Sequence, residues 1–297
     1  MSRSVAVLGV GAVGGALAAR LASAGVRVTC VCAPGTAAAI REGGLEVETP
    51  EGVLRARPEV AESLREAVSL LVVAVKAPSL EEALLRIEPQ AVADGVVVPL
   101  LNGLEHPAAV RARVGPRVAP GTIARFSGEL TGPGRVLERS GVPLVTVASG
   151  DLGRGAVEEA LRPLADSGVE VVVAGDERAV LWEKVARLGP LAAATVASGL
   201  AVGPLRADPG WRARLADAID EAVAIAAADG VTLHAADEWA IIDAMPPDAT
   251  TSAALDVARG RPSELDAIAG SVLRAAERHG LRCPGLAALV ERAERRR

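Results

Sequence analysis

Aromatic residues are nearly absent from this chain. They make up 1% of its 297 residues, with three Trp, one Phe and no Tyr. A core of useful size must therefore be built from Val, Leu, Ile and Ala, which suits a parallel sheet that helices bury on both faces. The length allows two domains at about 100–200 residues each.

Cysteine and histidine are also scarce. Cys30, Cys32 and Cys283 form neither a disulfide framework nor the spacing of zinc ligands. Cys30 and Cys32 alternate with Val31 in a strand-like run, where thiols act as small packing residues. The three histidines do not cluster, so we expect no metal site and no catalytic histidine. Such cysteine usage is typical of the reducing cytoplasm, where we expect the protein to be.

The sequence lacks both a long apolar run and a strong excess of one charge. No stretch approaches the roughly 20 apolar residues of a membrane helix, and the apolar run from Val5 is broken at Gly9. We therefore expect neither a membrane span nor a signal peptide. The formal net charge of −5, with both signs interspersed, gives no footprint for nucleic acid or an anionic membrane.

Short Val-rich runs alternate with helical patterns over the first half of the chain, which predicts an α/β fold with a doubly wound parallel sheet. The expected strands are 5–8, 26–32, 70–75, 95–101, 118–120, 143–147 and 169–173. After Gly175, helical periodicity replaces the strand-like runs. We therefore place one domain at 1–175 and an all-helical C-terminal domain at 176–297, with helices starting near Asp176, Asp208, Thr250, Ser263 and Leu286.

A glycine-rich turn follows the first expected strand. Gly9, Gly11 and Gly14 stand in a GxGxxG pattern whose intervening helical residues are Ala12 and Val13. Gly9 permits the tight turn, Gly11 lets the backbone approach a pyrophosphate, and Gly14 lets the helix pack on the strand. The helix N-terminus offers free N–H groups to phosphates. We predict that these five residues bind a dinucleotide and that the N-terminal domain is a Rossmann domain.

The end of the second strand normally separates NAD-binding from NADP-binding proteins. An acidic residue there binds the ribose 2′-hydroxyl, whereas an Arg binds a 2′-phosphate. This chain has Cys32 and Ala33 at that place, which do neither. Arg41 follows on an expected helix, where a solvated charge explains it equally well. These residues alone leave the cofactor open.

Four further motifs lie along the chain: Val75-Lys76-Ala77, Leu101-Asn102-Gly103, the Trp-x-Lys segment ending at Lys184, and the Ser-Glu-Leu-Asp segment around Glu264. Ser252 lies twelve residues before Glu264. In order and spacing these motifs resemble those of the ketopantoate reductase (2-dehydropantoate 2-reductase) family, and the likeness covers nearly the whole chain.

The resemblance implies a Rossmann domain followed by a helical domain, with the site in the cleft between them. It also implies that NADPH reduces a 2-oxo acid, first of all 2-dehydropantoate, to a 2-hydroxy acid. Lys184 would be the proton donor, Glu264 would hold substrate and lysine, Asn102 and Ser252 would orient cofactor and substrate, and Lys76 would lie near the nicotinamide ribose. The chemistry is compatible, because a Lys beside a carbonyl oxygen can stabilise its developing charge and donate a proton.

Three positions depart from the family pattern and keep alternatives open. The family has Asn four and eight residues after the Lys, where this chain has Leu188 and Ala192. A related reductase for a more apolar oxo or imine substrate is therefore an alternative. Ala33 replaces a family Arg and leaves NADP against NAD open. A non-catalytic NADP(H) sensor is a third hypothesis. A homodimer stays open too, because no decisive apolar stripe marks the helical half.

Overall fold

The computed structural model describes residues 4–296 and divides the chain into two compact units. The first unit contains the described residues up to Leu101 together with His106–Val180. The second contains Asn102–Glu105 together with the described residues from Leu181 onward. The short segment Asn102–Glu105 thus belongs with a unit that otherwise begins much later in the sequence.

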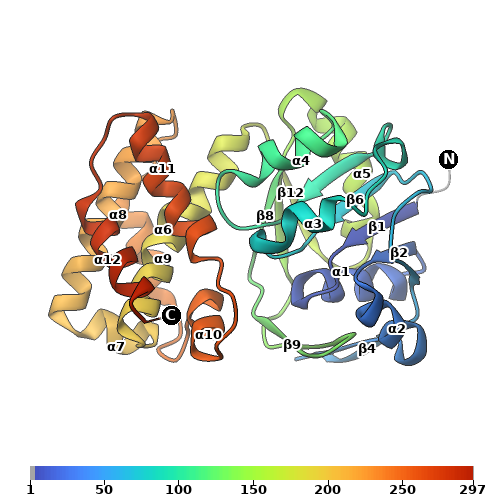
Figure 1. The fold of residues 1–297 in the computed structure, drawn as a ribbon, viewed down its shortest axis with the longest axis horizontal. Helices are drawn as coiled ribbons and strands as arrows, with labels where there is room; N and C mark the ends of the chain where they lie inside the picture. The colour runs from blue at the N-terminus through green and yellow to red at the C-terminus, as the bar shows by residue number, and fades with distance from the viewer. Residues whose placement is uncertain (1–3, 297) are drawn as a thin grey trace. The chain divides into compact units, whose positions relative to one another are not determined.

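The first unit is built on a five-stranded, all-parallel sheet with the strand order β5-β2-β1-β6-β7. Figure 1 labels β1, β2 and β6 of this sheet. The strands are β1 (Ser4–Leu8), β2 (Arg27–Val31), β5 (Glu59–Ala61), β6 (Leu70–Val73) and β7 (Val96–Pro99). The chain moves outward from β1 to β2 on one side and to β6 on the other, so the strand order reverses at β1. This confirms the predicted doubly wound Rossmann-type sheet.

Alternate residues of each central strand enter two separate cores. Val5 and Val7 enter a core with α1 and α5, whereas Ala6 and Leu8 enter a core with α3 and α4. The bounds of these helices are α1 (Ala12–Ser23), α3 (Leu80–Leu84), α4 (His106–Val114) and α5 (Arg154–Asp166). Because both faces are covered, the buried residues of these strands are apolar and include no aromatic side chain.

Two smaller mixed sheets complete the first unit, with the orders β4-β3-β10-β9 and β12-β11-β8. Their strands are β3 (Leu45–Thr49), β4 (Gly52–Ala56), β8 (Gly121–Ala124), β9 (Gly128–Gly132), β10 (Arg135–Glu138), β11 (Leu144–Ala148) and β12 (Glu170–Ala174). The remaining short helices are α2 (Pro34–Gly43), η1 (Ala77–Ser79), η2 (Pro89–Val92) and η3 (Gly150–Leu152). The strand expected at 118–120 is reduced to an isolated bridge between Val118 and Val97, and β8 starts after it.

The second unit contains helices and connecting loops in all of its described residues, which confirms the all-helical C-terminal region. After α6 (Glu177–Ser198), which begins in the first unit, come α7 (Val202–Ala207), α8 (Pro209–Ala228), α9 (Ala235–Ala244), α10 (Ser252–Ala258), η4 (Asp266–Gly270), α11 (Ser271–Arg278) and α12 (Pro284–Glu294). Side-chain caps start two of them: Asp208 Oδ1 accepts from Trp211 N at 2.8 Å, and Thr251 Oγ1 accepts from Ala254 N at 3.2 Å.

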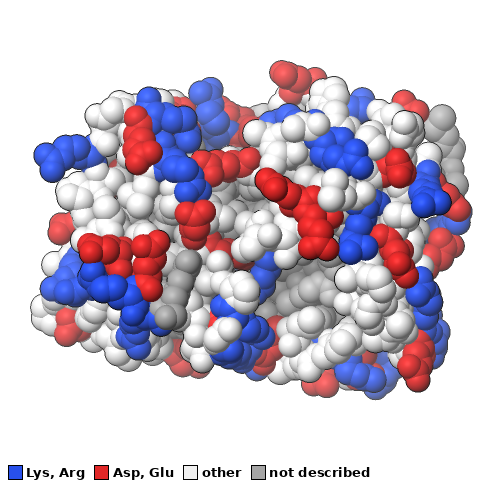
Figure 2. All heavy atoms as spheres, in the orientation of Figure 1, with Lys and Arg blue, Asp and Glu red and all other residues white. Residues whose placement is uncertain are grey.

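The helix expected from Ser263 is present and runs without a break from Leu265 to Arg278. Its first part, η4, is a π-helix, and Glu264 lies just before it rather than inside an α-helix. No helix among residues 4–296 has the length and apolar character required to cross a bilayer. Acidic and basic side chains are intermixed over the face shown in Figure 2.

Candidate active site

The three glycines of the turn between β1 and α1 meet three different structural requirements. Gly9 has a φ of +91°, and a Cβ added there would lie 2.4 Å from Val75 Cγ1. A Cβ on Gly14 would lie 1.9 Å from the Gly9 carbonyl oxygen. A Cβ on Gly11 would meet nothing within 4 Å. Gly9 and Gly14 therefore shape the turn, whereas Gly11 leaves open space beside it.

That open space lies at the N-terminus of α1. Gly11 is the N-cap residue, Ala12 and Val13 begin the helix, and no side chain caps this end. The first N–H groups of a helix have no intrahelical acceptor, and together with the helix dipole they attract an anion. The turn therefore fits a pyrophosphate, because it combines uncapped N–H groups with a backbone that no side chain covers.

Lys76, which the resemblance places near the nicotinamide ribose, is adjacent in sequence to a residue that contacts this turn. It comes after β6, and its neighbour Val75 is the residue that Gly9 closely approaches. Lys76 is exposed and is the N-cap residue of η1. Since β6 pairs with β1, the end of β6 leads to the same edge of the sheet as the glycine turn.

Lys184 and Glu264 come together electrostatically in the second unit. Lys184 lies on α6 and is partly buried. Burial lowers the pKa of Lys184, Glu264 raises it and Arg187 lowers it further, and together they leave this pKa at about 8. Glu264 is 8% exposed and precedes the π-helix η4, a rare element that is frequent at functional sites. A lysine with a strongly lowered pKa beside a buried carboxylate is a candidate acid–base centre.

The two motif lysines are also the only lysines in the sequence. The chain has 32 cationic side chains, and all except Lys76 and Lys184 are Arg. An Arg stays protonated, whereas a Lys can lose its proton when it is buried. The chain thus uses Arg for its other cations and keeps lysine at two motif positions. This compositional signal was available in the sequence.

Asn102 is held by the second unit through its neighbours. Gly103 has a φ of +102°, and a Cβ on it would lie 2.1 Å from the Ala267 carbonyl oxygen in η4. Glu105 accepts from Arg274 of α11 at 3.0 Å (Nε to Oε1) and 2.8 Å (Nη2 to Oε2). Gly103 is therefore required both by its conformation and by close packing. Asn102 is tied to the same π-helix that follows Glu264.

Ser252 is the exposed first residue of α10 and is not its cap. The cap is Thr251, whose hydroxyl also lies 2.8 Å from the hydroxyl of the fully buried Thr195 on α6. This link joins α10 to the helix that carries Lys184. The sequence pattern did not reveal it, because two threonines 56 positions apart carry no local signal. The substrate-binding role of Ser252 stays a prediction.

The face of α6 beyond Lys184 is apolar. Leu188 lies one turn on and is partly exposed, whereas Ala192 is fully buried. Between them, Gly189 faces α11, where an added Cβ would lie 3.4 Å from Val272 Cγ2. Of the two positions where the family has Asn, Leu188 is therefore partly exposed to solvent and Ala192 lies in the core.

A buried indole fixes α6 two residues before Lys184. Trp182 is 1% exposed, and its Nε1 donates to Asp229 Oδ2 at 2.7 Å. Asp229 ends α8, and its other carboxylate oxygen lies 3.0 Å from His279 Nε2 at the end of α11. Three helices therefore meet at this carboxylate, and α6 is fixed beside it.

A second anchor of α6 was not anticipated from the sequence. Arg187 forms an ion pair with Glu238 of α9, and the two side chains are 19% and 6% exposed. Arg187 stands three residues after Lys184, a spacing that places both on one side of a helix. That spacing was visible in the sequence, but the distant carboxylate was not.

Two family descriptions match the chain. "Ketopantoate reductase PanE/ApbA" matches residues 5–149, and "Ketopantoate reductase PanE/ApbA C terminal" matches residues 176–296. A 2-dehydropantoate 2-reductase of Caulobacter vibrioides is 31% identical over 296 residues, which cover 97% of each chain. Another, from Halobacterium salinarum, is 28% identical and covers 86% of this chain and 87% of its own.

Solved structures show the same likeness. A PanE/ApbA family ketopantoate reductase from Ralstonia eutropha JMP134 has a TM-score of 0.89 at 27% identity, covering 99% of this chain and 98% of that one. D-Mandelate dehydrogenase with NADH and anilino(oxo)acetate has a TM-score of 0.88, with the same coverage, at 21% identity, which shows the shared fold. The sequence and structural matches together establish that this chain is an oxidoreductase of the ketopantoate reductase family.

Proposed function

We propose that this protein uses NADPH to reduce a 2-oxo acid to a 2-hydroxy acid, with 2-dehydropantoate as the first candidate substrate. The observation that carries the proposal is Lys184, whose pKa burial lowers to about 8 and on which the buried Glu264 acts electrostatically. Membership of the ketopantoate reductase family supports the reaction class, and the names of the relatives supply the candidate substrate.

The glycine turn of the first unit would hold the cofactor. Gly9, Gly11 and Gly14 together with the first residues of α1 form a cradle that fits a pyrophosphate. We assign Lys76 and Asn102 to the nicotinamide half on the strength of their motifs. When bound, the reduced nicotinamide supplies the hydride. The residues of the chain bind, orient and handle the proton.

Lys184 is the proposed proton donor. A carbonyl carbon that accepts a hydride leaves negative charge on its oxygen, and the Lys184 ammonium stabilises that charge and transfers its proton. A pKa of about 8 keeps the group mostly protonated at neutral pH, yet makes it a stronger acid than an ordinary lysine. Glu264 holds the ammonium in place, and Ser252 and Asn102 would bind the substrate. The neutral amine regains its proton from solvent.

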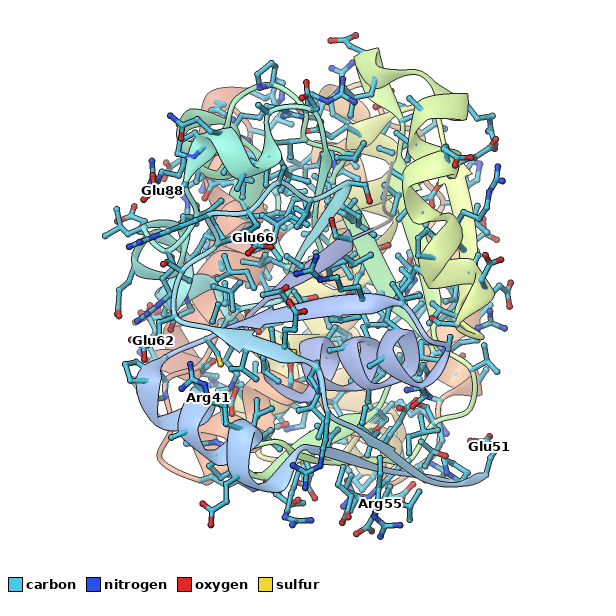
Figure 3. All side chains as sticks on the ribbon, turned by 90° about the vertical axis from the view of Figure 1, so that its right-hand side faces the viewer. Arg41, Glu51, Arg55, Glu62, Glu66 and Glu88 are labelled. Atoms are coloured by element: carbon cyan, nitrogen blue, oxygen red, sulfur yellow. The ribbon has the colours of Figure 1, made fainter. Side chains whose placement is uncertain are left out.

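NADP(H) is the proposed cofactor because of the charges around the end of β2. Burial raises the pKa of the Cys32 thiol, and both Arg41 and Arg86 act against this, while Glu62 adds to it. Arg41 also donates to the Val60 carbonyl of β5 at 3.3 Å. Figure 3 shows Arg41 and Glu62 on the same side of this unit.

Two guanidinium groups, Arg41 and Arg86, therefore act on this strand end against the carboxylate of Glu62, and Arg86 also pairs at 3.6 Å with the exposed Glu82. The position that an acidic residue occupies in NAD-binding proteins is Ala33, the exposed N-cap of α2. Arg41 and Arg86 offer donors to a 2′-phosphate, whereas Ala33 offers no acceptor to a 2′-hydroxyl. Arg41 and Arg86 would thus take over from the family Arg that Ala33 replaces.

A second candidate function keeps the reaction and changes the substrate to a more apolar 2-oxo acid. The apolar pair Leu188 and Ala192 favours it, since neither side chain can hydrogen-bond the terminal hydroxyl of ketopantoate. D-Mandelate dehydrogenase, which shares the fold, was solved with anilino(oxo)acetate.

The test is a turnover assay with purified protein. NADPH is mixed with ketopantoate, 2-oxoisovalerate or no oxo acid, and the absorbance of the reduced cofactor is followed. Oxidation that depends on the oxo acid supports the proposal. Binding of NADPH by calorimetry without turnover on either substrate would favour a cofactor sensor, and absence of binding would reject both.

A further inference from the structure

Arg187 and Glu238 form a nearly buried ion pair next to the candidate proton donor. Arg187 belongs to α6 and Glu238 to α9, and the two groups are 19% and 6% exposed. Burying two opposite charges is expensive unless the pair has good geometry, so such a pair is weak evidence of a purely stabilising role. Arg187 lies three residues from Lys184 on the same helix, so the charges of the pair also act on Lys184.

The charges around Lys184 act in opposite directions. Glu264 favours the protonated lysine, whereas Arg187 disfavours it. Arg187 is in turn opposed by Glu238, whose own pKa is raised by burial and lowered by Arg187. The exposed carboxylates of Glu183 on α6 and Asp237 on α9 raise the pKa of Glu238 further.

We propose that Arg187 and Glu238 are positioning residues for Lys184: Arg187 presents a positive charge beside the Lys184 ammonium, and Glu238 holds that guanidinium and partly offsets its charge. The inference rests on the proposed role of Lys184 and goes beyond it, because neither residue belongs to the motifs that carry the family resemblance. It adds a charge pair from α6 and α9 to the groups that tune the proton donor.

The consequence for the reaction follows from electrostatics. A positive neighbour favours departure of the Lys184 proton towards the substrate oxygen, so Arg187 strengthens the acid. Removing Arg187 weakens the acid but keeps it protonated to higher pH. Removing the charge of Glu238 leaves the field of Arg187 unopposed and has the opposite effect. A merely structural ion pair would not produce shifts of opposite sign.

The experiment compares pH profiles of kcat/KM between about pH 6 and pH 11 for four variants and the wild type. Activity needs a protonated Lys184 and should fall above about pH 8 in the wild type. R187M should move this alkaline limb to higher pH by about half a pH unit or more, and E238Q should move it to lower pH by about half a unit. The alkaline limb of the R187M/E238Q double variant should lie at a pH between those of the wild type and R187M.

E183Q is the matched control. It removes a carboxylate directly adjacent to Lys184 in sequence, but Glu183 is exposed, so solvent screens its charge and the limb should move by less than about 0.2 unit. E238Q leaves a buried cation without its partner and can fail to fold. The double variant removes both charges and keeps the test valid in that case.

The two-lysine composition allows a direct measurement without turnover. Acetylation of Lys184 with isotopically labelled acetic anhydride, read by mass spectrometry against Lys76, reports the pKa of Lys184 in each variant. The proposal is overturned if R187M leaves that pKa unchanged or lowers it, or if R187M and E238Q shift it in the same direction. Failure of the proposed function looks different: Lys184→Ala would then retain turnover and the alkaline limb.

Discussion

The two units carry function in different ways. In the first unit, the candidate cofactor turn is made by backbone: Gly9 and Gly14 shape it through a positive φ or a close approach, and Gly11 leaves open space beside it. In the second, the candidate proton donor Lys184 depends on a side chain from a distant segment, since Glu264 before η4 acts on it together with Arg187 of its own helix. The turn is therefore a local property of the sequence, whereas the acid–base centre depends on tertiary structure.

This difference predicts two distinct kinds of failure. A change in the glycine turn should remove binding of the cofactor, and a change at Lys184 should remove the chemical step while binding survives. If both changes affected binding and chemistry equally, the division of labour between the units would be wrong.

The largest effect is expected for Lys184→Ala. Loss of a positioned proton donor should lower kcat by roughly 10²–10⁴, while the Kd for NADPH, measured by calorimetry, stays nearly constant. In the wild type, activity should decline as the pH rises through about 8, because the donor loses its proton there. A fall in turnover of less than about fivefold would contradict the assignment, since general acid catalysis contributes more than that. Glu264→Ala should act mainly through the substrate KM.

Gly11→Asp should weaken NADPH binding by about a hundredfold or more without unfolding the protein. A Cβ at Gly11 meets nothing within 4 Å, so the fold tolerates it, but the added carboxylate repels the pyrophosphate. Gly14→Ala is the contrasting variant. Its Cβ would lie 1.9 Å from the Gly9 carbonyl oxygen, so it should lower the thermal midpoint as well.

Calorimetry and a thermal melt of the two variants separate these outcomes. Unchanged NADPH affinity in Gly11→Asp would show that the turn is only structural. Equal losses of stability in both variants would show that Gly11 also shapes the fold.

The same difference explains how much of the structure could be predicted. The doubly wound parallel sheet could be predicted from apolar runs and a glycine motif, which are local signals, but its strand order was not predicted. The strands β3, β4, β5, β9 and β10 were not predicted, because they are short and partly exposed and lack the apolar runs of buried strands. In the second unit most helices were predicted, but α7 and α9 were not. The Arg187–Glu238 and Thr195–Thr251 pairs were not predicted either, because each joins separate helices.

A smaller effect is expected for the preference between ketopantoate and more apolar substrates. Leu188 and Ala192 leave the terminal hydroxyl of ketopantoate without an amide partner on this face, which should cost about 1–3 kcal/mol, or roughly 5- to 150-fold in kcat/KM. 2-Oxoisovalerate should therefore be turned over relatively better in a substrate panel. Leu188→Asn should narrow the gap, whereas Ala192→Asn should destabilise the fully buried core. If kcat/KM for ketopantoate exceeded that for every apolar analogue by a hundredfold, the missing amides would be irrelevant.

The smallest effect concerns the choice between NADPH and NADH. Without an Arg at Ala33, the preference for NADPH should stay below about a thousandfold in kcat/KM, because the bidentate Arg–phosphate contact is missing. Arg41 and Arg86, which both act on the Cys32 thiol at the end of β2, should supply what preference remains. Replacing either with Ala should weaken NADPH binding about fivefold, as expected for a partly exposed charge contact, and leave NADH binding unchanged. Arg65→Ala, an exposed arginine of the same unit, is the matched control. Equal losses for both cofactors would show that the two arginines act on the fold and not on the 2′-phosphate, and an unchanged preference would place the discriminating cation elsewhere.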